Sequence, residues 1–353
     1  MPPIVHVFTA RFNPIGWRVP HQHYLDWAHY MRDLGADVTV IECAYGETPF
    51  KCALPGIVHH IGVRADSWAW TKENLINIGI SRRPEAKYIC WADSDIFPRR
   101  RDWVGATIET LQHYHIVQPW ETCYDLGPGD SHLETWKSFC SNYVHGRPLV
   151  VPDGETYASF WAKHSFPHPG YCWAAKRRVL DHVGGLFELG GMGSGDNHMA
   201  VGLLGLVNKS VHKDIGGGYR RVIEAWESRA QSAVNGRIGY VQGTIEHRFH
   251  GKKNNRMYWE RWQMFLRHGF DPTVDLKRNT WGVLEFAGNK PALEHEWDQY
   301  LRMRWEDDNG EGHAPFHRPP EHHHPQPSRH HSPHHLPAPP HPHPHPPGPL
   351  HGS

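Results

Sequence analysis

Residues 87–98 read Lys-Tyr-Ile-Cys-Trp-Ala-Asp-Ser-Asp-Ile-Phe-Pro, an apolar run that leads into two acidic residues. The part from 87 to 91 has the length and composition of a buried strand, so Asp93 and Asp95 come directly after a strand end. Two carboxylates at i and i+2 can converge on one divalent cation, or on a nucleotide ribose, where a strand turns into a loop. The alternative interpretation is an acidic turn that caps the next segment.

Strands and helices alternate on both sides of this run. The pattern predicts further strands at residues 4–9, 37–44, 56–63 and 116–119. It predicts helices at residues 21–34, 71–81, 103–114, 174–183, 196–206 and 257–268. Residues 125–165 are expected to be loops. Such alternation is typical of an α/β fold, with a Rossmann-like, mostly parallel central sheet flanked by helices, whose ligands bind at the carboxyl ends of the strands.

The composition narrows the class of protein. The 353 residues include 37 basic and 37 acidic side chains, so there is no strong overall basic field for nucleic acid, although a local patch stays compatible with this total. None of the six cysteines forms a CxxC pair, which favours buried, reduced, structural thiols over a zinc or redox motif. No apolar run approaches membrane length, so we expect a cytoplasmic protein with no membrane partner.

The composition changes completely near the C-terminus. Residues 313–353 contain 13 His and 14 Pro and have almost nothing apolar to bury. We therefore expect one domain over residues 1–310 and a disordered His/Pro-rich tail over residues 311–353. A solvated tail is favoured there over a specific metal site.

A glycine-rich loop precedes the helix expected at 196–206. Residues 190–199 read Gly-Gly-Met-Gly-Ser-Gly-Asp-Asn-His-Met, and the glycines would let the backbone approach a ligand closely. Asp196 would then be placed to accept a proton from an incoming hydroxyl group. The ordinary structural interpretation, which this motif alone favours, is an Asp that caps the helix.

Two further motifs carry candidate ligands. Residues 246–251 read Glu-His-Arg-Phe-His-Gly, in which one imidazole would reach a metal ion, or the histidines would merely end a strand. Residues 71–77 read Thr-Lys-Glu-Asn-Leu-Ile-Asn. Lys72 and Asn77 on this helix would face a uracil-type base or a diphosphate, or would lie on an ordinary exposed helix face.

In their order along the chain, these motifs resemble the GT-A family of nucleotide-diphospho-sugar transferases. The resemblance includes His-Pro-Gly-Tyr-Cys-Trp-Ala at 168–174 and covers about residues 4–251, and the order is its specific part. It implies a nucleotide-sugar-binding half over residues 1–120 and an acceptor-binding half over residues 121–310. It also implies a nucleotide-sugar donor, in particular a UDP-sugar, and a Mn²⁺ or Mg²⁺ cofactor.

Carried over residue by residue, the resemblance implies that Asp93 meets the ribose or the metal and that Asp95 binds the metal. His250 would be the late metal ligand, and Asp196 the catalytic base that serves the acceptor. One departure is Gly195, since many members of the family have an acidic residue before the catalytic one. This departure leaves open whether Asp196 is a base or only positions the acceptor.

A narrower resemblance is to phage-type transferases that glycosylate hydroxymethylated pyrimidines in DNA. It rests on Trp70-x-Lys72-Glu73, on residues 91–96 and 247–251, on Arg256-x-Tyr258 and on residues 270–272. It implies modified DNA as the acceptor and the host cytoplasm as the location. The basic and aromatic run 252–259 would then grip phosphates and stack a flipped base, or would be a solvated turn before a helix.

Two other functions are compatible with the same residues. One is a transferase acting on a saccharide or on a lipid carrier. The other is a non-catalytic carbohydrate-binding protein that uses its 16 tryptophans as platforms for sugars. The ordered acidic and histidine motifs argue against the second of these.

Overall fold

The computed structural model describes residues 3–308. Its centre is a seven-stranded sheet in which six strands run parallel where they pair with one another, and β10 runs antiparallel to both of its neighbours. The order across the sheet is β11 (Ile238–Tyr240), β6 (Ile116–Gln118), β10 (Cys172–Lys176), β4 (Tyr88–Ala92), β1 (Val5–Phe12), β2 (Asp37–Tyr45) and β3 (His59–Ala65). The predicted α/β fold with a mostly parallel central sheet is confirmed.

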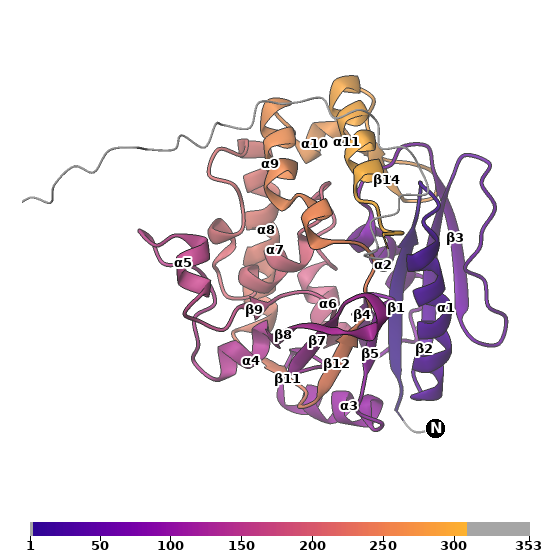
Figure 1. Cartoon of the computed structure of the whole chain (residues 1–353), viewed down its shortest axis with the longest axis vertical. Helices are drawn as coiled ribbons and strands as arrows, with labels where there is room; N and C mark the ends of the chain where they lie inside the picture. Colours follow the sequence, from indigo (N-terminus) through magenta and orange to yellow (C-terminus); the bar gives the residue numbers. More distant parts are fainter. Residues whose placement is uncertain (1–2, 309–353) are drawn as a thin grey trace, which may run out of the picture. The chain divides into compact units, whose positions relative to one another are not determined.

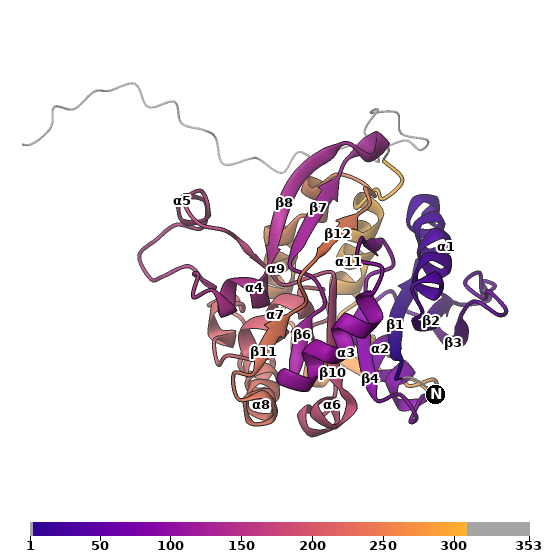
Figure 2. The same ribbon diagram turned by 90° about the horizontal axis from the view of Figure 1, so that it is seen from below.

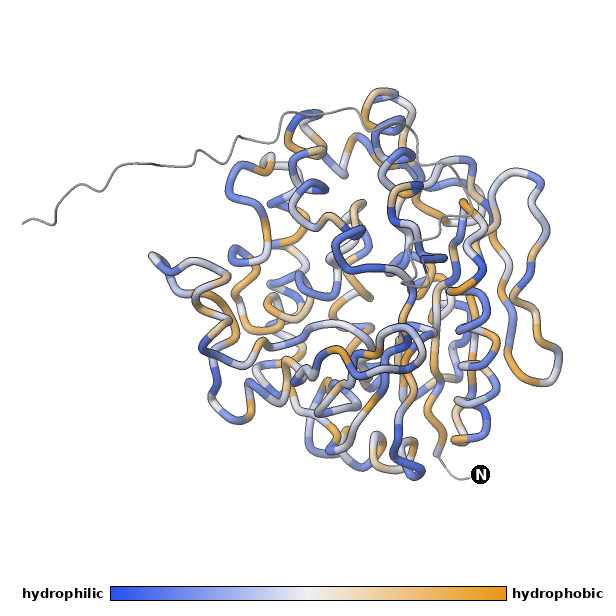
Figure 3. Tube along the Cα trace, in the orientation of Figure 1, coloured by the Kyte–Doolittle hydropathy of each residue, from blue (hydrophilic) through white to orange (hydrophobic). Residues whose placement is uncertain are grey.

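Each face of the sheet builds its own apolar core. Along β1, Val5 and Val7 point into one core and Phe8 points into the other, as the alternation of side chains along a strand requires. The first core is closed by α1 (Arg18–Asp33) and α3 (Trp103–His113). Helices on the opposite face are α2 (Lys72–Ser81), α6 (Arg177–Val183), α7 (Gly195–Gly202) and α8 (Gly217–Val234) (Figures 1 and 2). In Figure 3 the helix α1 alternates between hydrophilic and hydrophobic residues, as expected for a helix that covers a sheet.

A second sheet brings the chain near His247 close to the acidic residues that follow β4. Its five strands are, in order, β5 (Ile96–Pro98), β12 (Thr244–His247), β7 (Thr122–Leu126), β8 (His132–Ser138) and β9 (Pro167–His168). In this sheet β12 lies between β5 and β7, with His247 opposite Ile96 on one side and Asp125 on the other. The chain near residue 250 is thereby held against the loop that follows β4.

Several sequence expectations need correction. The helix predicted for 174–183 begins only at Arg177, because residues 172–176 form β10, which pairs with β4 on one side and with β6 on the other. Residues 125–165, expected to be loops, contain the end of β7 and all of β8, as well as α4 (Phe139–Val144) and α5 (Tyr157–Trp161). The remaining elements are η1 (Pro128–Asp130), η2 (Val207–Lys209), η3 (Lys253–Arg256), α9 (Tyr258–Arg267), α10 (Pro272–Asp275), β13 (Leu276–Arg278), β14 (Leu284–Phe286) and α11 (Pro291–Met303).

Two other expectations concern the whole chain. All six cysteines are buried and unpaired, as predicted for structural thiols. Within residues 3–308, no helix combines the length and the apolar character that crossing a membrane requires. The tail predicted for residues 311–353 lies outside the described residues.

Candidate active site

The loop after β4 lies at the carboxyl edge of the central sheet, where the parallel strands β1 and β4 end side by side. The backbone N–H of Asp93 donates to the carbonyl of Tyr171 at 2.8 Å. Arg11, near the end of β1, donates to the hydroxyl of Ser94 at 3.2 Å. The first bond fixes the backbone of the acidic loop beside the start of β10, and the second holds the side chain of Ser94 from β1.

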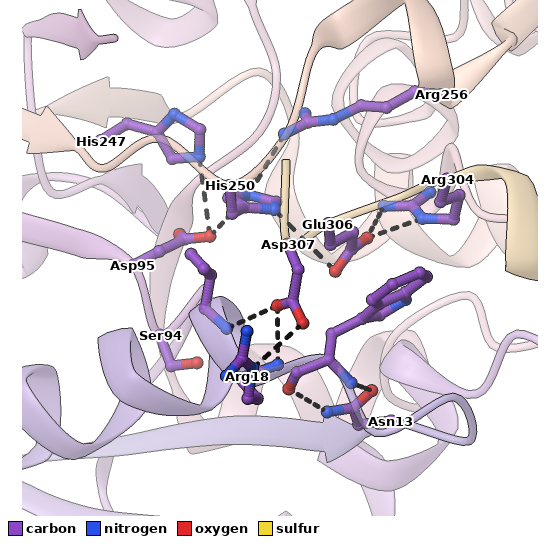
Figure 4. A network of polar contacts seen from close by, with 12 residues as sticks. Asn13, Arg18, Ser94, Asp95, His247, His250, Arg256, Arg304, Glu306 and Asp307 are labelled. Atoms are coloured by element: carbon purple, nitrogen blue, oxygen red, sulfur yellow. Dashed lines mark hydrogen bonds and ion pairs between the residues drawn. The ribbon is translucent and has the colours of Figure 1, made fainter. Parts of the chain in front are cut away.

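Asp95 meets two histidines from the far end of β12. Its Oδ2 lies 3.0 Å from Nε2 of His250 and 3.6 Å from Nε2 of His247 (Figure 4). Each of the three residues offers a possible metal-ligating atom, and these three atoms all lie within 4.8 Å of one another. The backbone supports this arrangement, because the N–H of Arg248 donates to the carbonyl of Asp95 at 3.0 Å. The structure therefore brings together Asp95 and His250, and it adds His247 to them.

His247 is oriented by a buried carboxylate behind it. Oδ1 of Asp125, which is 2% exposed, lies 2.7 Å from Nδ1 of His247. A carboxylate that accepts the Nδ1 proton leaves Nε2 to face the ligand side, which is the usual arrangement behind a metal-binding imidazole. Lys253 forms an ion pair with the other oxygen of Asp125 and also pairs with Glu134.

The charges of this cluster are strongly coupled. Burial alone would raise the pKa of the Asp95 carboxyl, but the imidazoles of His247 and His250 outweigh burial and hold that pKa well below its usual value. Burial alone would lower the pKa of His247, but the carboxylates of Asp95 and Asp125 raise it to about 9. The cluster is thus a place where positive charge is strongly favoured.

The donor set fits a divalent cation of the manganese type. Two imidazoles and one carboxylate suit borderline ions, whereas Mg²⁺ prefers oxygen ligands and retains its water. Oδ1 of Asp95 and Nδ1 of His250 are buried and have no hydrogen-bond partner among the described residues. Such orphaned polar atoms are costly unless a ligand or a hydrogen-bond donor satisfies them.

Asp93 lies outside this group of three. Its carboxylate is 2.5 Å from the ammonium of Lys72, which is the first residue of α2. Burial raises the pKa of the Asp93 carboxyl, and the ammonium of Lys72 only partly offsets this. Lys72 in turn has a raised pKa, because the effect of its burial is outweighed by Asp93, Asp196 and Glu73. The sequence interpretation of Asp93 as a metal ligand stays a prediction, and the contact that the structure gives it is with Lys72.

Lys72 and Asp196 line one small pocket next to the acidic loop. The other lining residues are Glu73, Trp91, Ala92, Gly170, Tyr171, Cys172, Trp173 and Met199. A side chain at Gly170 would place its Cβ only 2.9 Å from Oδ2 of Asp196, so glycine is needed there to leave room for the carboxylate. The pocket lies between the carboxyl end of β4 and the N-terminus of α7.

Asp196 is the second residue of α7, and Ser194 is the N-cap. Oδ1 of Asp196 accepts a hydrogen bond from the N–H of Asn197 at 2.8 Å. Arg261, which is buried, ties down the preceding loop by donating to the carbonyl of Met192 at 2.7 Å. Tyr171 (φ 76°), which lines the pocket, and Ser194 (φ 63°), which caps α7, both have left-handed backbones, and strain of this kind is concentrated at functional sites.

Asn77 is placed away from this pocket. Its carboxamide accepts from the N–H of Leu186 at 2.8 Å and donates to the carbonyl of Leu186 at 3.0 Å. It also donates to the carboxylate of Glu188 at 3.1 Å. The side chain therefore anchors the turn after α6, and its contacts do not support the expected role in binding a base or diphosphate.

The segment after α11 completes the surroundings of His250. Arg256 donates to Nε2 of His250 at 3.1 Å, and Glu306 lies 3.9 Å from Nδ1 of the same ring (Figure 4). Glu306 is held by Arg304, while Asp307 accepts the backbone N–H groups of Arg18 and Val19 at the start of α1. Sequence reasoning missed Arg304, Glu306 and Asp307, because nothing in the local pattern near residue 306 indicates a contact with residue 250 or residue 18.

The basic run 252–256 is paired within the chain. Lys252 lies 3.8 Å from a carboxylate oxygen of Asp308, and Lys253 pairs with Asp125 and Glu134. Arg256 is turned toward His250. In this conformation the run is not a free cationic surface for phosphates.

Comparison with known proteins gives a weak likeness in fold. No family model and no curated protein matches the chain. The catalytic domain of Drosophila β1,4-galactosyltransferase 7, solved in complex with xylobiose, is 11% identical over 82% of this chain and 98% of that chain, with a TM-score of 0.36. TarS 1–349 of S. aureus, in complex with UDP-GlcNAc, is 9% identical over 84% of this chain and 70% of that chain, also with a TM-score of 0.36. A putative nucleotide-diphospho-sugar transferase from Desulfovibrio desulfuricans G20 is 10% identical over 86% and 97%, with a TM-score of 0.29. Likeness at this level does not place the chain in a family, and the function has to be argued from the site.

Proposed function

We propose that this protein is a metal-dependent GT-A glycosyltransferase that moves a sugar from a nucleotide-sugar donor to an acceptor hydroxyl group. The observation that carries the proposal is the cluster of Asp95, His247 and His250, next to the Lys72–Asp93 pair and to Asp196, at the carboxyl edge of a mostly parallel sheet. Ligands of such sheets bind at this edge, and the sequence order of these groups supports the same function.

The proposed roles follow from charge and position. A divalent cation held by Asp95, His247 and His250 would neutralise the diphosphate leaving group. Lys72 keeps its positive charge and would bind the same diphosphate or the sugar attached to it. Asp93, held by Lys72, would accept hydrogen bonds from the ribose or the sugar.

Asp196 would remove the proton from the acceptor. In the inverting form of this reaction the acceptor oxygen bonds to the anomeric carbon while the bond from that carbon to the diphosphate oxygen breaks. The proton of the acceptor hydroxyl passes to the carboxylate of Asp196. Asp196 lies in the first turn of the eight-residue helix α7, where the helix dipole interacts favourably with a carboxylate.

The first experiment is a donor-hydrolysis and transfer assay. The wild-type protein is incubated with a panel of nucleotide sugars, with manganese or with chelator, and nucleoside diphosphate release is measured. Release that requires manganese supports the proposal, and a non-catalytic carbohydrate-binding protein would release none with any donor. Full activity in chelator would contradict the metal dependence, but it would still be compatible with a transferase.

The acceptor is the second question. The resemblance to phage enzymes favours 5-hydroxymethylpyrimidine in DNA. The ion pairs of Lys252 and Lys253 favour a saccharide, because contact with DNA phosphates would first have to break them. Mass spectrometry of the products after incubation with plain DNA, hydroxymethylated DNA and a simple saccharide separates these acceptors.

A further inference from the structure

Glu73 is a buried carboxyl group to which the roles above give no task. It is 6% exposed and is the second residue of α2, directly after Lys72. Among residues 3–308, no side chain forms a hydrogen bond or a close ion pair with it; its own backbone N–H is its donor. The neighbouring ammonium of Lys72 is in contact with Asp93 instead. A carboxyl group has two oxygens with several acceptor sites, and a single backbone N–H leaves acceptor capacity that an incoming group could use.

The carboxyl group of Glu73 faces the pocket that contains Asp196. Lys72, Glu73 and Asp196 supply its acidic and basic groups, and Trp91, Trp173 and Met199 are among its apolar walls. Gly195, the first residue of α7, lies directly against Glu73, and a Cβ at Gly195 would be 2.6 Å from Oε1. Glycine at this position therefore leaves the carboxyl group in place at the pocket wall.

The surroundings also affect which form the carboxyl group takes. Burial raises the pKa of Glu73 to about 7, although Lys72 lowers it and the negative charges of Asp196 and Asp93 raise it further. Near neutral pH a large fraction is then protonated, and a neutral carboxyl group offers one donor and an acceptor oxygen. A sugar hydroxyl also donates and accepts, so it matches this group in either form.

We propose that Glu73 hydrogen-bonds a hydroxyl group of the sugar that is being transferred and so determines which donor sugars are accepted. This inference rests on the proposed function, because it takes the mouth of the pocket between Lys72 and Asp196 as the place of that sugar. The pocket itself has room for about one water-sized group, which one sugar hydroxyl would fill. The diphosphate would lie toward Lys72 and the acceptor toward Asp196, with Glu73 facing the ring between them. Glu73 is therefore a specificity-determining residue, and the chemistry it recognises is a polyhydroxylated ring.

The experiment compares the donor with its own nucleoside diphosphate. Wild-type protein is first screened by calorimetry, with manganese present, against UDP-glucose, UDP-galactose, UDP-GlcNAc and the corresponding GDP-sugars and CDP-sugars. Glu73→Ala and Glu73→Gln are then titrated with the tightest of these and with the matching diphosphate alone. We expect Glu73→Ala to weaken binding of the nucleotide sugar by about 10–100-fold, the range for a lost hydrogen bond to a charged or strong partner, and to leave the diphosphate unchanged. Glu73→Gln, which can still donate and accept, is expected to stay within a few-fold of wild type.

A matched control is Glu227→Ala. Glu227 packs near Gly202 at the opposite end of α7 and accepts from the N–H of Val207, outside the pocket. Equal loss for sugar and diphosphate in Glu73→Ala, or the same loss in Glu227→Ala, would mean that Glu73 only supports the fold, and the inference fails. Unchanged affinity for the nucleotide sugar in Glu73→Ala overturns it as well. If wild-type protein binds no nucleotide sugar at all, the proposed function fails, and this outcome is distinguishable from the other two.

Discussion

Replacement of Asp125 by Asn tests the cation site without touching a proposed ligand. Asp125 is 2% exposed, and its Oδ1 lies 2.7 Å from Nδ1 of His247. The amide keeps the size of the side chain but removes the negative charge that orients the imidazole and makes it more basic. Loss of such an outer carboxylate weakens metal binding by about 10–100-fold. At about 1.4 kcal/mol per factor of ten, this corresponds to roughly 1.4–2.8 kcal/mol.

The assay is titration of the protein with Mn²⁺, followed by calorimetry or by electron paramagnetic resonance of the free ion. The matched control is Glu134→Gln, because Glu134 also pairs with Lys253 on the same hairpin but does not touch His247. We expect the control to bind Mn²⁺ as wild type does, with circular dichroism showing both variants folded. Wild-type affinity in Asp125→Asn, or an equal loss in Glu134→Gln, would refute the orienting role of Asp125.

Three further predictions concern the same site. Asp95→Asn should lose most of its turnover in a transfer assay, and a variant as active as wild type would exclude Asp95 as a metal ligand. Wild-type activity that chelator removes should return more fully with Mn²⁺ than with Mg²⁺. Asp196→Asn should lower kcat by about 10²–10⁴-fold while donor affinity measured by calorimetry stays nearly unchanged, and near-normal turnover would assign the base elsewhere. In chelator, protonated His247 stabilises the fold fully below pH 6.5, and this contribution is lost as pH rises through about 9. Thermal midpoints should therefore fall between pH 6.5 and 9 in wild type, and less steeply in His247→Gln; parallel curves would argue against a raised pKa at His247.

Sequence predicts those parts of the site that lie next to the ends of strands and helices. The apolar run before Asp93 predicts a buried strand, and the carboxyl ends of parallel strands share one edge of a sheet. The structure places Asp93 and Asp95 at that edge and Asp196 in the first turn of a helix, as expected. The histidine motif of residues 246–251 predicts one metal-binding imidazole, that of His250, and the structure brings His247 near Asp95 as well.

Other parts depend on tertiary contacts that no local pattern contains. The spacing within α2 suggested Asn77 as a ligand contact, but the direction of that side chain is decided by the turn at Leu186. Residues 174–176 have good helix propensity, yet pairing with β4 and β6 makes them a strand. Asp125 lies in a segment that looked irregular, and its role becomes visible only when β7 is paired with β12.

The bond between Asp307 and the start of α1 has a consequence for the order in which the protein is made. The N–H groups of Arg18 and Val19 are capped by a carboxylate that follows them by 289 and 288 positions. At about 5–20 residues per second, a ribosome reaches Asp307 roughly 15–60 s after it has made the first turn of α1. The ring of His23, on α1, lies 6.4 Å from that of His250, so the same helix forms one side of the cation cluster. We therefore expect α1 to settle into its final position, and the site beside it to become complete, only when synthesis of the described chain is almost finished.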